Sequence, residues 1–131
     1  MLNATTATMT PPSNHADMNQ GINLFNRAHY FDAHEVLEDV WRSLPREGPA
    51  RRHLQGMVQL AVAFHHESTG NKVGAGSVLD RARRNLNGAD SSFPQLDFDR
   101  LRANIVEWQK YLAGTNPRPL PPQIARRNLA P

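Results

Sequence analysis

The chain has no cysteine among its 131 residues. This absence excludes disulfide bonds, zinc sites with thiolate ligands and cysteine nucleophiles. No apolar run approaches the roughly 20 residues of a membrane-spanning helix. The first ten residues also lack the basic start and the apolar stretch of a secretory signal. With a mean hydropathy of −0.60, the sequence leads us to expect a soluble, cytoplasmic protein without a membrane partner.

Motifs of common enzyme classes are missing as well. The sequence has no phosphate loop ending in Gly-Lys-Ser or Gly-Lys-Thr, no dinucleotide-binding glycine motif and no Gly-x-Ser-x-Gly motif. Residues 34–38, His-Glu-Val-Leu-Glu, approach the zinc-protease motif His-Glu-x-x-His. Glu38, however, stands where that motif requires its second zinc-binding histidine. Protease chemistry is therefore not expected.

Basic residues outnumber acidic ones by 15 to 12, which gives a net charge of +3, and arginine supplies 13 of the 15. Arginine pairs occur at residues 51–52, 83–84 and 126–127, with Arg81 beside the second pair. The pairs are dispersed and do not alternate with aromatic residues. Two interpretations stay open, namely ordinary solvated faces or a surface for nucleic acid.

Apolar residues recur at spacings of three and four, which is typical of helices, and no segment alternates with the period of a strand. The pattern predicts five helices, over about 17–27, 32–43, 49–69, 71–87 and 97–113. The apolar stripes contain Met18, Ile22 and Phe25; Ala33, Leu37, Val40, Trp41 and Leu44; Ala75, Leu79, Ala82 and Leu86; and Phe98, Leu101, Ile105, Trp108 and Leu112. Residues 56–64 are apolar nearly all round. We therefore expect a single-domain all-α bundle with a central third helix.

Local signals predict where these helices begin and how closely they pack. Asp32 and Glu35 have the spacing of a capping box, and Asn71 and Asp97 are suitable N-cap residues. Glycines at 74 and 76 lie in the first turns of the fourth helix. They are expected to let a neighbouring helix approach closely.

The ends of the chain differ from its middle. We predict a flexible tail over residues 1–16, the bundle over 17–113 and a proline-rich extension over 114–131. Prolines prevent a long helix in the extension, so it is either a flexible end or a strap over the bundle. A homodimer is expected if Trp108 or the stripe of the fifth helix is not fully buried within one chain.

A group of polar residues falls on the helices predicted at 32–43 and 49–69. His34 lies inside the apolar stripe of the first of these helices and Glu38 on its flank, while Gln55, Gln59 and His66 share one face of the second. If these faces meet, they form a His/Glu/Gln pocket. One interpretation is a structural hydrogen-bond network. The other is a site for a small ligand or a divalent metal.

The second interpretation assigns roles to particular side chains. His34 and Glu38 are the candidate catalytic residues, and together with His66 they are the candidate metal ligands. The corresponding activity is metal- or histidine-dependent hydrolysis of a small substrate. The alternative is a non-enzymatic interaction module for a protein or nucleic-acid partner, in which the polar group is purely structural.

Three ordered blocks of the sequence resemble a known family. Phe-Asn at 25–26 precedes Tyr-Phe-Asp-Ala-His-Glu-x-x-Glu-x-x-Trp at 30–41. Leu-Gln-Gly-Met-Val-Gln follows at 54–59 with His-His at 65–66, and Gly-Asn at 70–71 precedes Gly-Ala at 74–75. The blocks resemble the signature of the domain of unknown function 309 family, with Asp32 where glutamate is common. The resemblance covers about residues 22–87 and implies a small helical bundle. The site positions it implies are His34, Glu35, Glu38, Trp41, Gln55, Gln59 and Asn71.

Overall fold

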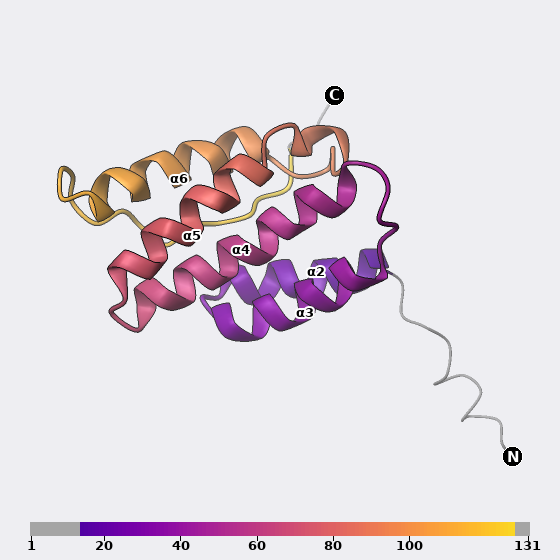
Figure 1. Cartoon of the computed structure of the whole chain (residues 1–131), viewed down its shortest axis with the longest axis horizontal. Helices are drawn as coiled ribbons and strands as arrows, with labels where there is room; N and C mark the ends of the chain where they lie inside the picture. Colours follow the sequence, from indigo (N-terminus) through magenta and orange to yellow (C-terminus); the bar gives the residue numbers. More distant parts are fainter. Residues whose placement is uncertain (1–13, 128–131) are drawn as a thin grey trace, which may run out of the picture.

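Five α-helices and one short 3₁₀-helix run through residues 14–127, the part of the chain described by this computed structural model (Figure 1). Residues 1–13 of the predicted tail lie outside that part, and residues 14–16 begin the first helix. The helices are α2 (Asn14–Asn26), α3 (Tyr30–Ser43), α4 (Ala50–Ser68), α5 (Lys72–Asn85), η1 (Ala89–Ser91) and α6 (Phe98–Leu112). Between residues 14 and 127 the only β-pairing is a single antiparallel bridge from Leu96 to Arg126.

Helix α4 is the centre of the bundle. It packs against α3 on one side and α5 on the other, while α2 covers α3 and α6 lies beside α5 (Figure 1). A helix enclosed on two sides must be apolar over most of its circumference. The buried residues of α4 are His53, Leu54, Gly56, Met57, Leu60, Ala61, Ala63 and Phe64. The predicted all-α bundle with a central third helix is confirmed.

Four aromatic side chains tie this arrangement together. Phe25 of α2, Tyr30 of α3 and Phe64 of α4 form a mutual cluster, with ring centroids 5.3–6.0 Å apart. Trp108 of α6 meets Phe64 edge to face at 5.0 Å. Trp108 is 1% exposed, so one chain buries it completely. Leu112 of the same stripe is half-buried, and the homodimer stays a prediction.

Two of the three predicted caps are confirmed. The Asn71 side chain accepts a hydrogen bond from the backbone N–H of Gly74 at 2.9 Å, and Asp97 accepts one from Arg100 at 3.0 Å. The predicted capping box at Asp32 is wrong. Helix α3 begins two residues earlier, with His29 as a cap that makes no side-chain hydrogen bond. Asp32 therefore lies within the first turn, where its charge still favours the helix dipole.

The close helix contacts are not at the predicted glycines. A Cβ atom on Gly76 would meet nothing within 4 Å, and on Gly74 it would meet only the capping side chain of Asn71. Gly56 is the glycine that brings α4 against α5, because a Cβ there would lie 2.9 Å from the Leu86 Cγ atom. The expectation for positions 74 and 76 is thus corrected, since both face away from the neighbouring helix.

The described part of the proline-rich extension, residues 114–127, is a strap that runs back along the bundle from the end of α6 (Figure 1). The Trp108 Nε1–H donates to the Leu120 carbonyl at 3.2 Å. The Asn26 side chain donates to the Ile124 carbonyl at 3.0 Å and accepts from its N–H at 2.7 Å. These bonds satisfy backbone N–H and C=O groups of the strap that have no partner within a helix or sheet.

No helix within residues 14–127 is long and apolar enough to cross a membrane.

Candidate functional site

His34 and Glu38 form a pair on the outer side of α3. The His34 Nε2 atom lies 3.4 Å from the Glu38 Oε1 atom, and Arg42 donates to the other carboxylate oxygen at 3.2 Å. His34 Nδ1 is 3.1 Å from the carbonyl oxygen of Phe31. The hollow beside this pair is lined by α3 alone, through His34, Glu35, Val36, Glu38, Asp39 and Arg42. The pair is therefore a half-exposed surface feature of one helix.

Two residues predicted to meet this pair turn towards α5 instead. The Gln59 Oε1 atom accepts a hydrogen bond from the Asn85 Nδ2 atom of α5 at 2.8 Å. His66 Nδ1 lies 3.4 Å from the Asn71 side chain at the start of the same helix. The face of α4 that carries Gln59 and His66 therefore contacts α5 and its cap, whereas we expected it to contact α3.

A different face of α4 meets α3. The Arg51 guanidinium lies 4.1 Å above the Trp41 ring, and the His65 ring is 5.5 Å from that of Phe31. Positions 65 and 66 differ by about 100° around a helix. The observed contact face of α4 thus differs from the predicted one by a rotation of about 100° about the helix axis, which corresponds to one residue. His65 therefore lies nearer to α3 than His66 does.

The predicted metal-ligand set is not assembled. Within residues 14–127, no three histidine, cysteine, aspartate or glutamate side chains lie close enough together to hold a metal ion. His34 and Glu38 pair with each other on α3, whereas His66 lies by the cap of α5. The grouping of these three residues as metal ligands is therefore corrected, because α4 presents His66 to the other neighbouring helix.

The remaining predicted site residues have mainly structural surroundings. Glu35 is exposed and Gln55 is half-buried, and Asn71 caps α5. Arg51 donates to the Trp41 carbonyl oxygen at 3.3 Å, in addition to its contact with the Trp41 ring. The Trp41 Nε1 atom is buried and has no hydrogen-bond partner among the described residues.

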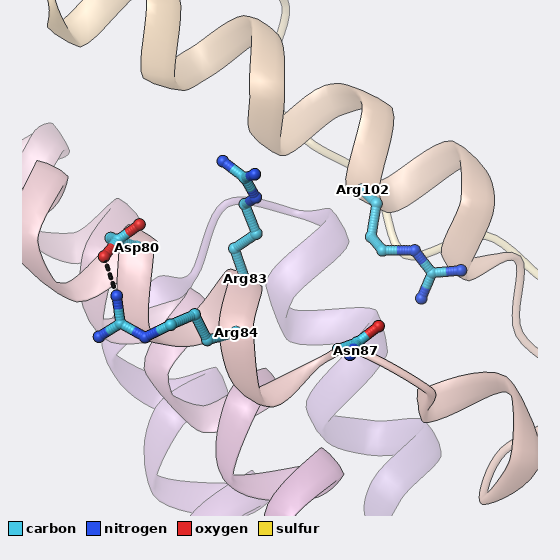
Figure 2. Close-up of a pocket in the computed structure, with 5 residues that line it drawn as sticks. All are labelled: Asp80, Arg83, Arg84, Asn87 and Arg102. Atoms are coloured by element: carbon cyan, nitrogen blue, oxygen red, sulfur yellow. Dashed lines mark hydrogen bonds and ion pairs between the residues drawn. The ribbon is translucent and has the colours of Figure 1, made fainter.

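A basic hollow that we did not predict opens between α5 and α6. Its volume is about 610 Å³. Figure 2 shows Arg83 extending from α5 towards α6, Arg84 turning back along α5 to its ion-pair partner Asp80, and Arg102 extending from α6 to the side away from Arg83. The residues that line this basic hollow are Asp80, Arg83, Arg84, Asn87 and Arg102.

The arginines of the basic hollow differ in how they are neutralised. Arg102 forms ion pairs with Asp90 and Asp99, both at 2.9 Å. Arg83 instead donates to the neutral Gln109 Oε1 atom at 2.8 Å, and no carboxylate of residues 14–127 pairs with it. Arg83 is thus the one lining arginine without a carboxylate partner among the described residues, since Arg84 pairs with Asp80. The side chains that line the basic hollow are three arginines, one aspartate and one asparagine.

Arg52 of α4 adds positive charge beside the basic hollow. Its guanidinium donates to the carbonyl oxygens of Arg84, Asn85 and Asn87 at 3.2–3.3 Å. These carbonyls end α5, where the helix dipole favours a cation. Sequence pairs had identified Arg52, Arg83 and Arg84. That these three arginines lie in the same region as Arg102 depends on how α4, α5 and α6 pack.

His53 links the start of α4 to the segment that follows α5. It is 1% exposed, and its Nδ1 atom lies 2.6 Å from the Ser92 Oγ atom. The Nε2 atom lies 3.1 Å from the carbonyl oxygen of Asn87. Burial, followed by the positive charge of Arg52, lowers the pKa of His53, although Asn87 and Asp90 act in the opposite direction. The folded protein therefore holds His53 neutral.

This lowered pKa predicts acid sensitivity. In the unfolded chain His53 takes up a proton as the pH falls through its ordinary pKa of 6.5, while the folded protein resists that proton. The unfolded state then binds more protons, so the free energy of unfolding should decrease as the pH falls below 6.5. Urea denaturation at pH 7.5 and 5 should show a smaller decrease for His53→Gln than for the wild type. Equal decreases would contradict the assignment.

Comparison with known proteins relates the first part of the bundle to a family. Residues 18–78 match the family described as "Domain of unknown function (DUF309)". The "Uncharacterized protein YpuF" of Bacillus subtilis (strain 168) is 33% identical over 73 residues, which are 56% of this chain and 41% of YpuF. An "Uncharacterized protein" of Aquifex aeolicus (strain VF5) is 25% identical over 100 residues, which are 76% of this chain and 28% of that protein.

The chain thus spans less than half the length of both relatives. The matched residues 18–78 contain the α3 motif and all of α4, whereas every residue that lines the basic hollow follows them. The blocks at 30–41, 54–59 and 70–71 fall inside the match, so the resemblance seen in the sequence is confirmed. Over residues 18–78 this chain is thus similar to the domain of unknown function 309 family.

Proposed function

We propose that this protein is an interaction module that binds the phosphate backbone of nucleic acid through the basic hollow. The observation that carries the proposal is that Arg83, Arg84 and Arg102 line one open hollow with a single lining carboxylate. Guanidinium groups suit phosphate because their planar N–H donors match two of its oxygens.

The chemistry of the lining favours backbone contacts over base recognition. No aromatic residue lines the basic hollow, so there is no platform on which a base could stack. Arg83 has no carboxylate partner among the described residues, and a phosphate would replace only its bond to Gln109. Binding should therefore depend on charge and change little with base sequence.

The pocket first expected between α3 and α4 receives less support. Gln59 and His66 bond to the α5 side, so His34 and Glu38 lack the partners that a ligand site on α3 would need. A module that binds through α5 and α6 uses the polar residues of α3 and α4 structurally.

The proposal predicts a salt-dependent affinity for a fluorescent 20-base-pair DNA duplex. If three phosphates are neutralised, the logarithm of the association constant should fall with the logarithm of the salt concentration with a slope of about −2.7. Arg83→Gln should reduce the steepness of that slope by about 1 and weaken binding at low salt. Fluorescence anisotropy across a potassium chloride series measures both quantities.

Arg42→Gln is the matched control. It removes one arginine from α3, where Arg42 pairs with Glu38 and Asp39, and leaves the basic hollow intact. Its slope and affinity should equal those of the wild type. The proposal is wrong if the duplex does not bind at 50 mM salt, or if Arg42→Gln weakens binding as much as Arg83→Gln.

A further inference from the structure

A second, apolar hollow of about 230 Å³ lies at the other side of His53, where α2, α3 and α4 meet the segment after η1. Its volume suits a short acyl chain. Five of its lining residues are apolar, and the two polar ones, Ser92 and Gln95, lie close together in the sequence. The full lining is Met18, Val40, Leu44, Leu54, Ser92, Phe93 and Gln95.

The hydrogen bonds of His53 fix which of its ring nitrogens carries the proton. Nε2 lies 3.1 Å from the Asn87 carbonyl oxygen, which can only accept, and 3.2 Å from Arg52 Nη2, which can only donate. We assign Nε2 as the donor to Asn87. Arg52 donates to the same carbonyl at 3.2 Å, which explains why its Nη2 atom also lies near Nε2. Nδ1 is then unprotonated, and at 2.6 Å it accepts the hydroxyl proton of Ser92.

This is the arrangement of an activated nucleophile. A hydroxyl group bonded to a neutral imidazole, which is oriented through its other nitrogen, has the three parts that nucleophilic catalysis by serine requires. We propose that Ser92 and His53 form a serine–histidine dyad that hydrolyses small esters with a short apolar acyl group. The carbonyl of Asn87 takes the orienting role.

The reaction proceeds in two balanced halves. His53 Nδ1 takes the Ser92 proton as the Oγ atom attacks the ester carbonyl carbon, and the same proton then passes to the departing alkoxide oxygen. The acyl group is left on Ser92. Water, deprotonated by His53, next attacks the acyl carbon, and the Ser92 oxygen leaves with that proton while the carboxylic acid departs. Gln95 lines the same hollow, and we assign its side-chain amide as the donor to the developing oxyanion.

The surroundings of His53 suit a general base at neutral pH. Burial and the neighbouring Arg52 lower the pKa of the ring, against smaller opposite effects of Asn87 and Asp90. The imidazole is therefore already unprotonated when substrate arrives. Ser92 itself is half-buried and lines the hollow, so its oxygen lies between the base and the acyl site.

A fluorophosphonate probe tests the dyad directly. The serine oxygen displaces fluoride from phosphorus, and the adduct is located by mass spectrometry of peptides. We expect the label on Ser92 and a measurable hydrolysis of p-nitrophenyl butyrate, with both lost in Ser92→Ala. Ser91→Ala is the matched control, because the Ser91 hydroxyl donates to the Gly88 carbonyl at 2.9 Å and does not line the apolar hollow. It should keep wild-type labelling and hydrolysis.

The role of His53 needs its own variant. His53→Gln should lower the rate of Ser92 labelling by about 100-fold or more while the far-UV circular dichroism stays helical. If that variant unfolds, the pH dependence of labelling in the wild type decides, since the rate should fall as His53 becomes protonated in acid. Labelling of Ser92 no faster than of Ser91, or a pH-independent rate, would overturn the proposal. Ser92 labelling and duplex binding are separate measurements on the wild-type protein, so this test and the DNA-binding test can fail separately.

Discussion

Replacing Trp108 with alanine should lower the free energy of unfolding by about 3–5 kcal/mol, the range for deleting a buried large aromatic side chain. The indole is 1% exposed and packs edge to face on both Phe64 and Tyr111, at 5.0 and 5.6 Å. Its removal opens a cavity at the point where α4 and α6 meet. Thermal unfolding should show a midpoint lower by more than about 10 °C.

The same substitution should loosen the C-terminal strap. Trp108 donates to the Leu120 carbonyl, and the Arg118 guanidinium lies 5.1 Å from the ring centroid. Arg118 also makes two bonds to Glu67, at 3.0 and 3.2 Å. We expect hydrogen exchange to accelerate over residues 118–124 in Trp108→Ala, beyond the change in the rest of the folded protein. Uniform acceleration would show that the strap does not depend on the indole.

Trp108→Phe and Trp41→Phe form a matched pair for the indole N–H. At position 108 the change leaves an aromatic ring but removes a hydrogen bond, and should cost about 1–2 kcal/mol. At position 41 the lost N–H is buried without a partner among the described residues, so stability should change by less than about 1 kcal/mol. Equal losses at the two positions would contradict this difference between the indoles.

The helices could be predicted from the sequence because their signals are local. Leu79 and Ile105 lie on stripes with helical spacing and are buried as expected, and the caps at Asn71 and Asp97 need only the residues that follow them. The orientation of α4 could not be predicted in the same way. A helix that is apolar nearly all round has no single apolar stripe to fix its rotation about its axis. The pattern alone therefore did not show whether the Gln59 face or the His65 face of α4 contacts α3.

The two proposed sites could not be predicted from the sequence for a related reason, because their residues are brought together only by the tertiary structure. The basic hollow takes Arg83 from α5 and Arg102 from α6, and the dyad joins His53 to Ser92 across 39 positions of sequence. Neither set shares a motif, and no local period relates its members. The family match ends at residue 78, before most of these side chains, so the family signature carries no information about them.

Gly56 should tolerate a larger side chain poorly. A Cβ atom there would lie 2.9 Å from Leu86 Cγ and 3.1 Å from Asn85 Cβ, so the added atoms of leucine have no space unless α4 and α5 separate. Gly56→Leu should cost about 3 kcal/mol, the upper part of the usual range for overpacking. Chemical denaturation followed by circular dichroism measures the loss.

Alanine at the same position gives the sharper comparison, because helix propensity and packing then act in opposite directions. Replacing a helical glycine with alanine gains about 0.5–1 kcal/mol when nothing obstructs the new methyl group. Gly76 of α5 meets that condition, with no atom within 4 Å of its Cβ position, so Gly76→Ala should stabilise the protein by that amount. Gly56→Ala should instead destabilise it, since the methyl group would meet Asn85 Cβ and the side chain of Leu86, which is fully buried. If both variants gained stability, α4 and α5 would not depend on the absence of a side chain at residue 56 for their close approach.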